Sequence, residues 1–263
     1  MAAVSAVVLA VRAVVGGVDE HGATVLRYSI DSRLAHAALP QVAVEPPGAG
    51  SGRPLLVFLH GKGEDQESNL VGQMFGELAH LGPRAPDVVF PYGGEDSYWH
   101  DRREGAWGRY VLDEVIPQAV RRMHADPRRV AIGGLSMGGF GAYDLARLRP
   151  GTFCAVGADS AALWREGGET APGAFDDGED FSRNDVIGAA RSGASTYGRA
   201  RLWLDVGASD PFRSADTELV QVLRDHGRSV SFHVWPGGHE ESYWDSHWGA
   251  YLDFYAAALA ACR

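Results

Sequence analysis

The sequence predicts an α/β fold in which a mostly parallel sheet carries helices on both faces. Short apolar runs over residues 55–59, 88–90 and 130–132 alternate with segments that have helical periodicity. This alternation is typical of parallel strands joined by right-handed crossovers. With 263 residues and 45% hydrophobic residues, the chain is large enough to bury a sizeable core. We therefore expect a single α/β domain over residues 1–263.

The N-terminal part predicts an antiparallel hairpin. A valine-rich run over residues 2–15 is followed by a glycine-containing turn at 16–22 and by a second run over residues 23–30. Residues 2–15 are also apolar enough to suggest a signal peptide. However, Arg12 interrupts the run, no basic segment precedes it and no good cleavage site follows it. These missing features favour a strand and a cytoplasmic protein, and they leave export open.

Strands and helices alternate through the rest of the chain. Apolar runs and period-2 alternation predict strands over residues 42–44, 55–59, 88–90, 130–132, 153–156, 202–206 and 230–234. Helical periodicity and capping signals predict helices over residues 74–80, 110–123, 215–226 and 243–260, and a further helix should open at residues 134–138 and run toward residue 148. Pro117 should kink or split the second of these helices.

Residues 163–185 interrupt the alternation. The segment is rich in glycine and acidic residues and shows little periodicity, so we expect a small lid insertion that passes over the site. Asp176, Asp177, Glu179 and Asp180 could attract calcium, but their spacing does not fit the EF-hand loop. A solvated acidic loop is the simpler interpretation.

Charge and cysteine content exclude several classes of protein. The formal net charge of -10 argues against nucleic acid as a partner, because such a surface repels phosphates. No run of 18 uncharged apolar residues is present, so we expect no membrane span. We interpret Cys154 as a small core residue and Cys262 as part of a frayed end. No Cys/His cluster has zinc spacing, and we expect neither a metal nor a cofactor.

Gly134-Leu135-Ser136-Met137-Gly138 is a G-x-S-x-G motif between a buried strand and a helix. In that context the motif is typical of a nucleophile elbow, a sharp turn that exposes the serine hydroxyl. The two glycines relieve the crowding of the turn. A glycine-rich turn with an incidental serine is the alternative interpretation, and the strand–turn–helix context favours a catalytic Ser136.

A nucleophilic serine needs a base within hydrogen-bond reach, and the elbow predicts that the base follows it in the chain. His239 meets this requirement because it lies in the loop after the last predicted strand. His247 is placed inside the predicted final helix, and His233 lies within a strand. His60 ends a strand near the site but precedes the serine, which is the wrong order for a base.

The base in turn needs an orienting carboxylate. Asp210 follows the strand over residues 202–206, and loops at the carboxyl ends of parallel strands share one edge of a sheet. Asp159, after the preceding strand, is the main rival, whereas Asp205 lies within its strand. We therefore predict a triad of Ser136, Asp210 and His239.

Attack on an ester carbonyl creates an oxyanion that two backbone N–H groups usually stabilise. The residue after the nucleophile supplies the first, which here is Met137. The loop after an early strand supplies the second, and the Gly61-Lys62-Gly63 turn predicts Lys62. A plain glycine loop is the alternative interpretation of this turn.

Together these motifs resemble the esterase group of the α/β-hydrolase superfamily, which contains esterase D-like and feruloyl-esterase-like enzymes and the antigen 85 mycolyltransferases. The resemblance is carried over residues 54–255 by the 134–139 elbow, His60-Gly61, Tyr98-Trp99 with Trp107, and the 236–239 loop. It implies the α/β-hydrolase fold and a metal-independent acyl transfer by the triad. The mycolyltransferases use glutamate as their acid, so Asp210 favours a general carboxylesterase.

The leading hypothesis is a serine esterase that cleaves small-molecule carboxylic esters through an acyl-serine. Tyr98, Trp99 and Trp107 either line an apolar acyl pocket or belong to the core. Acyl transfer to a sugar or another alcohol is an alternative that differs only in what attacks the acyl-serine. A non-catalytic binding protein with a hydrolase fold is the second alternative. Neither the ester cleaved nor the oligomeric state can be read from the residues.

Overall fold

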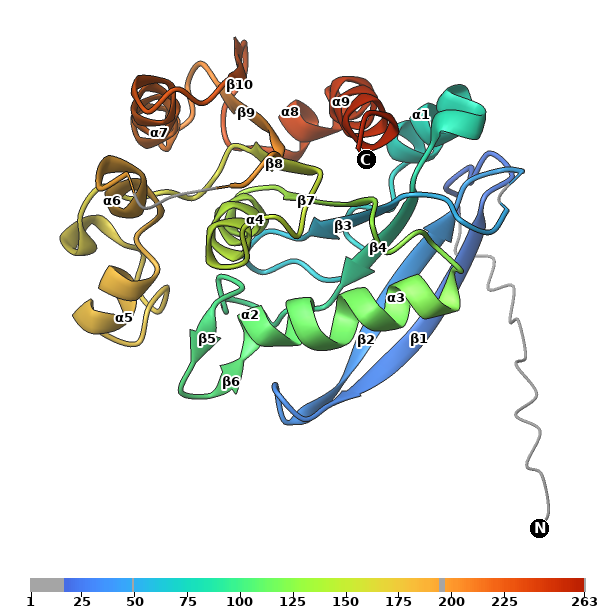
Figure 1. Ribbon diagram of the computed structural model, residues 1–263, viewed down its shortest axis with the longest axis horizontal. Coiled ribbons are helices and arrows are strands. Elements are labelled where there is room, and N and C mark those ends of the chain that lie inside the picture. Colours follow the sequence, from blue (N-terminus) through green and yellow to red (C-terminus); the bar gives the residue numbers. More distant parts are fainter. Residues whose placement is uncertain (1–16, 49, 194–196, 263) are drawn as a thin grey trace.

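The computed structural model describes residues 17–48, 50–193 and 197–262 (Figure 1). In this part of the chain an eight-stranded sheet has the order β1-β2-β4-β3-β7-β8-β9-β10. The strands are β1 (Thr24–Ser32), β2 (Ala37–Glu45), β3 (Leu55–Leu59), β4 (Asp87–Pro91), β7 (Val130–Gly134), β8 (Ala155–Asp159), β9 (Arg201–Gly207) and β10 (Val230–Trp235). Strands β4, β3, β7, β8, β9 and β10 run parallel to one another, and β2 pairs antiparallel with both β1 and β4. The predicted mostly parallel sheet is therefore confirmed.

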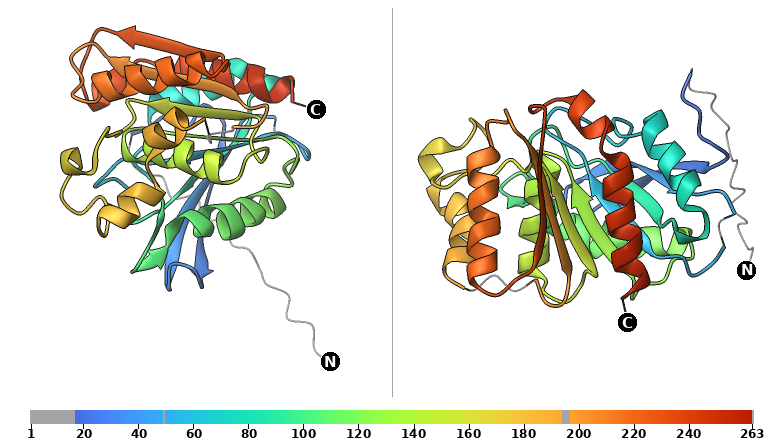
Figure 2. Two further views of the ribbon diagram at one scale, coloured as in Figure 1. Left: turned by 60° about the vertical axis from the view of Figure 1, so that its left-hand side comes forward. Right: turned by 90° about the horizontal axis from the view of Figure 1, so that it is seen from above.

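Helices cover both faces of this sheet (Figures 1 and 2). Their bounds are α1 (Gly72–Leu81), α2 (Trp107–Arg109), α3 (Ile116–Arg122), α4 (Met137–Leu148), α5 (Gly178–Arg183), α6 (Val186–Arg191), α7 (Arg213–Asp225), α8 (Glu241–Asp245) and α9 (Trp248–Ala260). Helices α1 and α9 pack on one face, and α3, α4 and α7 pack on the other. A separate hairpin is formed by β5 (Asp101–Arg102) and β6 (Gly105–Ala106).

Strand β3 shows how the two layers of core arise from the sequence. All five of its side chains are buried. Leu55, Val57 and Leu59 join the core under α3, α4 and α7, whereas Leu56 and Phe58 join the core under α1 and α9. Because successive side chains point to opposite faces, a strand covered on both sides must be apolar throughout.

The N-terminal hairpin is present, but its partners differ from the prediction. The strand expected over residues 23–30 is β1. It pairs with the next strand in the chain, β2, and Ile30 lies opposite Leu39 in this pairing. The expected partner over residues 2–15 lies outside the described residues. The run at 42–44 is the most buried part of β2, which extends from 37 to 45. Exposed residues in the first half of β2 hid its full length from the apolar pattern.

Two predicted helices are divided. A π-helical segment over Tyr110–Val115 directly precedes α3, whose first turn contains Pro117. Proline has no N–H to donate, and the π-helical segment directly before it interrupts the regular α-helical hydrogen-bond pattern at this point. The predicted final helix is interrupted at residues 246–247, between α8 and α9. His247 therefore lies at the start of α9, and its ring stacks on Trp235 at 4.1 Å.

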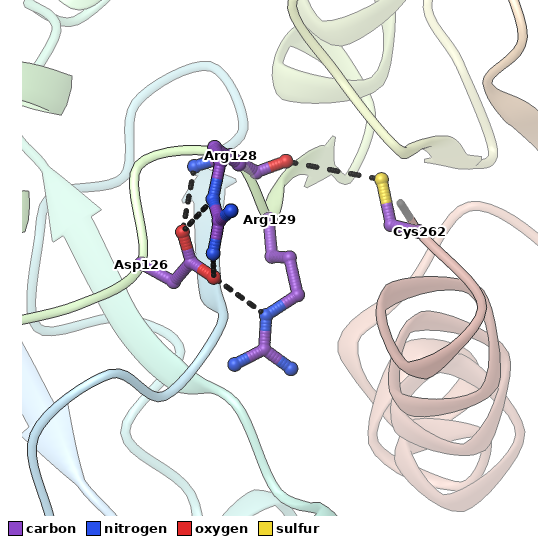
Figure 3. A pocket seen from close by; sticks show the side chains of 4 residues that line it. All are labelled: Asp126, Arg128, Arg129 and Cys262. Atoms are coloured by element: carbon purple, nitrogen blue, oxygen red, sulfur yellow. Dashed lines mark hydrogen bonds and ion pairs between the residues drawn. The ribbon is translucent and has the colours of Figure 1, made fainter.

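Cys154 and Cys262 form a disulfide bond, so their interpretation as separate thiols is wrong. The two residues are 108 positions apart, and their Cα atoms are 5.7 Å apart. Cys154 precedes β8 and Cys262 follows α9, so the bond ties the last helix to the sheet. Spacing alone could not show that α9 runs back to the beginning of β8. A pocket beside Cys262 is lined also by Asp126, Arg128 and Arg129 (Figure 3).

Residues 163–185 are tied to the body of the protein by ion pairs. Asp180 in α5 is fully buried and lies 3.0 Å from His100, so it is not part of a solvated loop. Asp176 pairs with Arg102, and Asp177 pairs with Arg103. Among the described residues, no group of three or more His, Cys, Asp or Glu side chains could hold a metal ion.

None of the helices in the described ranges combines the length and the apolar character needed to cross a membrane.

Candidate active site

Ser136 stands at the turn between β7 and α4 with φ of +52°. Its N–H donates to the carbonyl of Asp159 at 3.0 Å, which fixes the turn against the end of β8. A Cβ atom at Gly134 would lie 2.5 Å from the Leu59 carbonyl oxygen, and one at Gly138 would lie 2.0 Å from it. Both positions therefore require glycine. This left-handed serine between two obligatory glycines has the geometry of the predicted elbow.

His239 and Asp210 converge on Ser136 from the loops after β10 and β9. The Nε2 atom of His239 lies 2.8 Å from the Ser136 Oγ, and its Nδ1 atom lies 2.8 Å from the Asp210 Oδ2. The Asp210 side chain is fully buried, and its Oδ1 accepts the N–H of Phe212 at 2.7 Å. Because a carboxylate only accepts, it holds the His239 proton on Nδ1 and leaves Nε2 to accept from the serine hydroxyl.

Two aromatic side chains that sequence reasoning missed contact the His239 ring. Phe212 lies 5.1 Å from it and Trp244 lies 4.9 Å from it, measured between ring centroids, and both approach edge to face. These contacts leave the imidazole little room to rotate. Phe212 stands two positions after Asp210, so its closeness to the acid was the available signal. Trp244 lies in α8 and gave no local signal.

The rival carboxylates are engaged elsewhere. Asp159 and Asp205 face each other as a buried pair, and burial raises the pKa of the Asp159 carboxyl well above its usual value. Asp205 accepts hydrogen bonds from Trp203 Nε1 at 2.8 Å and from the Tyr243 hydroxyl at 2.7 Å. Of the three candidates, Asp210 is the one that contacts His239.

The rival histidines also have other partners. His233 stacks on Trp235 at 4.8 Å, and His247 stacks on the same ring from α9. His60 is buried, and its two ring nitrogens contact the backbone of Gly61 and Gly93. The chain-order argument thus selected the histidine that the fold brings to Ser136.

The two predicted oxyanion donors have free N–H groups. Within the described part of the chain, neither Lys62 nor Met137 donates its backbone N–H to a protein acceptor. Met137 begins α4, whose positive dipole end favours a negative charge at this position. Lys62 is exposed, and it is the only lysine among the 24 lysine and arginine residues.

Glu64 belongs to the same loop, and sequence reasoning did not single it out. Its Oε2 accepts the Gly61 N–H at 2.7 Å. Burial raises the pKa of the Glu64 carboxyl, and the charges of Glu241 and Asp65 raise it further, whereas His239 lowers it. Carboxylates thus gather on the Lys62 side of the site. An aromatic wall is formed by Phe212, which contacts His239, and by Trp164, which contacts Phe212.

The three aromatic residues predicted to line an acyl pocket have different surroundings. Tyr98 is 3% exposed and packs on Trp164 at 5.3 Å, which in turn contacts Phe212. Trp99 is fully buried, with its Nε1 donating to the His60 carbonyl at 3.2 Å. Trp107 is 9% exposed and packs on Tyr110. Of the three, Tyr98 is connected to His239 through the rings of Trp164 and Phe212, whereas the ring contacts of the described residues link neither Trp99 nor Trp107 to it.

The sequence is similar to that of known esterases. A family described as "Putative esterase" matches residues 38–252. An iron(III) enterobactin esterase from Dickeya dadantii (strain 3937) is 26% identical over 201 residues, which is 73% of this chain and 45% of that protein. The chain thus spans less than half the length of this relative.

Solved structures share the fold. A ferulic acid esterase superposes with a TM-score of 0.75 at 21% identity, covering 90% of this chain and 98% of the other. An S-formylglutathione hydrolase from Agrobacterium tumefaciens superposes with a TM-score of 0.74 at 19% identity, covering 91% and 96%. These likenesses confirm the predicted α/β-hydrolase fold. Because the family match covers well over half of the sequence, the chain belongs to the putative esterase family.

Proposed function

We propose that this protein hydrolyses small-molecule carboxylic esters through an acyl-serine, with Ser136 as nucleophile, His239 as base and Asp210 as orienting acid. The continuous relay of 2.8 Å contacts from Asp210 to His239 to Ser136 carries the proposal. A serine hydroxyl is a weak nucleophile unless a positioned base removes its proton, and this relay supplies one.

The reaction runs in two halves. The Ser136 Oγ attacks the ester carbonyl carbon while His239 Nε2 takes the hydroxyl proton, and the carbonyl oxygen becomes an oxyanion held by the N–H groups of Lys62 and Met137. The C–O bond to the alcohol then breaks, and His239 returns its proton to the leaving alkoxide. Water attacks the acyl-serine by the same route and releases the acid.

We also propose that residues 163–185 form a small lid over the site and that residues 1–263 form a single domain. Trp164 stands at the start of the lid and contacts both Tyr98 and Phe212. Because Phe212 touches His239, this aromatic wall is suited to an apolar or aromatic acyl group. The names of the similar proteins suggest a screen that includes feruloyl esters, S-formylglutathione and enterobactin beside p-nitrophenyl esters of increasing chain length.

The first test compares two serine variants. Ser136→Ala should reduce the turnover of p-nitrophenyl butyrate to a residual rate. The corresponding loss in a comparable serine hydrolase is about 10⁶-fold. Ser160→Ala is the matched control, because Ser160 is also a buried serine with φ of +52° after a strand, yet its hydroxyl has no hydrogen-bond partner among the described residues. Turnover by Ser136→Ala at the rate of Ser160→Ala would exclude the proposed nucleophile.

Two further experiments separate the alternatives. A fluorophosphonate probe should label the wild type and not Ser136→Ala, whereas a non-catalytic binding protein would leave both unlabelled. Adding an acceptor alcohol during ester cleavage detects transfer. A transesterified product that replaces the free acid would assign the protein to the acyltransferases.

A further inference from the structure

His60 carries a distinct set of contacts at the end of β3. Its side chain is buried at 1% exposure, and its Nε2 atom receives the backbone N–H of Gly93 at 3.1 Å. A nitrogen that accepts this hydrogen bond carries no proton, so the ring proton lies on Nδ1. Nδ1 in turn donates to the carbonyl of Gly61 at 2.8 Å. These two contacts select one neutral tautomer.

The Gly61 carbonyl and the Lys62 N–H belong to the same peptide group. In a planar trans peptide these two groups point in opposite directions, and the described backbone contains no cis peptide bond. The hydrogen bond from His60, which is shorter than the one that the Glu64 N–H donates to the same carbonyl at 3.3 Å, therefore helps to fix the direction of the Lys62 N–H as well. On the other side, Glu64 holds the Gly61 N–H at 2.7 Å. The strand-end loop is thus held on both sides of Gly61.

The surroundings prevent the His60 ring from turning. The Trp99 ring lies 4.9 Å from it, and the Tyr92 ring stacks on it at 5.8 Å. Trp99 itself is wedged in place, because a Cβ atom at Gly93 would lie 2.3 Å from its ring and one at Gly141 would lie 2.5 Å from its Cβ. Burial lowers the pKa of His60 to about 4, so the ring stays neutral near pH 7.

We propose that His60 is a positioning residue of the oxyanion hole, which aims the Lys62 N–H at the oxyanion by holding the opposite end of the same peptide. The inference rests on the proposed function, because it assigns a role relative to the anion formed at Ser136. It accounts for a histidine whose place in the chain excludes it as the base. It also gives Trp99 a role, which is to hold the His60 ring in place.

The test compares two replacements that each keep half of the contacts. The amide of His60→Asn can reach the position of Nδ1 and donate to Gly61, whereas the longer amide of His60→Gln can reach the position of Nε2 and accept from Gly93. His60→Gln should lower kcat for p-nitrophenyl butyrate by about 10- to 100-fold, since a misdirected donor loses much of its effect. Its KM should change less than about threefold, because the ground-state carbonyl needs the donor less. His60→Asn should retain kcat within about threefold of wild type.

The binding of a trifluoromethyl ketone, which mimics the oxyanion, provides a second readout. Its affinity for the two variants should fall in proportion to kcat/KM. A loss of kcat that is equal in both variants would overturn the proposal, as would wild-type kcat in His60→Gln. Leu55→Ala, at the opposite end of the same strand, controls for general destabilisation and should lower Tm while leaving kcat unchanged.

The wild-type protein gives a third readout. Long-range ¹H–¹⁵N spectra of histidine-labelled protein should contain, besides the His239 ring, a second ring with its proton on Nδ1 at pH 7, and the signals of this second ring should be absent from His60→Gln. An Nε2–H tautomer or a doubly protonated ring for His60 would overturn the inference. The proposed function fails separately, if Ser136→Ala keeps its turnover. An inactive Ser136→Ala beside a fully active His60→Gln would reject the positioning role alone.

Discussion

The two ends of the parallel strands are built differently. At the carboxyl ends, four of the seven described non-glycine residues with positive φ gather, namely Tyr98, Trp99, Ser136 and Ser160. Left-handed backbone costs about 1–2 kcal/mol at each non-glycine residue. At the opposite end the chain is cross-linked by the Cys154–Cys262 disulfide. Conformational strain is thus concentrated at the edge that holds the candidate site, and covalent stabilisation lies at the other edge. Substitutions at the two edges should therefore affect different properties.

The largest effect is expected at the strained edge, from Asp210→Asn. The amide would no longer hold the His239 proton on Nδ1, and kcat should fall by about 10⁴-fold with little change in the free energy of unfolding. Hydrolysis of p-nitrophenyl butyrate and thermal unfolding measure the two quantities. Asp216→Asn is the control, because burial raises the pKa of this carboxyl well above its usual value and the amide replaces a neutral group. Equal losses in the two variants would show that Asp210 has no special role.

At the opposite edge the disulfide should affect stability alone. It closes a loop of 108 residues, so its loss should lower the free energy of unfolding by about 4–5 kcal/mol in the chain-entropy description. The double variant Cys154→Ala/Cys262→Ala should keep the kcat of the wild type. Urea unfolding of both proteins, with and without dithiothreitol, measures the difference. A fall in kcat at temperatures where the variant remains folded would contradict the separation of the two edges.

His60 makes the strained edge sensitive to acid. Its pKa is lowered by burial from 6.5 to about 4, so the folded protein binds fewer protons than the unfolded chain between these values. Stability from this group is complete above pH 6.5 and is lost as the pH falls towards 4, by at most about 3 kcal/mol. His60→Gln cannot titrate, so its free energy of unfolding should fall less steeply over this window. Urea unfolding of the wild type and of His60→Gln at pH 4 to 7 measures this difference. If His60 is charged in the folded state, the free energy of unfolding will change with pH equally in the two proteins.

The smallest effect is expected from replacing the positive-φ residue Ser160 by glycine, which removes backbone strain without touching the predicted triad. Ser160→Gly should stabilise the protein by about 1 kcal/mol, because glycine adopts positive φ freely and the buried hydroxyl has no partner among the described residues. Ser136→Gly should give a smaller gain, because it also removes the hydrogen bond to His239, and it should lose all turnover. Differential scanning calorimetry of both variants tests this pair. A destabilised Ser160→Gly would indicate that its hydroxyl makes a contact that the backbone argument omits.

Much of the fold was predictable because each strand covered on both faces must be apolar, as the residues of β3 are. The same reasoning located the loops that hold Ser136, Asp210 and His239, since parallel strands end at one edge. Their side chains do meet there, and their catalytic roles stay a prediction. The disulfide was missed because it depends on how α9 packs across the sheet, which no local pattern contains.

Side-chain environments were harder to foresee than strand ends. The sequence marks Trp99 as an aromatic residue in a loop, and only the packed structure shows it fully buried behind His60. Asp180 looked like one of several solvated acids, yet its partner His100 lies 80 positions away in the chain. Contacts of this kind depend on the tertiary arrangement, so patterns read over a few residues carry no information about them.

The single lysine of the chain has a practical consequence. Apart from the N-terminal amine, Lys62 is the only primary amine of the protein, and it is exposed beside the candidate nucleophile. Succinimidyl dyes, aldehyde fixatives and amine-coupled sensor chips would therefore attach at two places, the N-terminal amine and the loop that holds the predicted oxyanion donor.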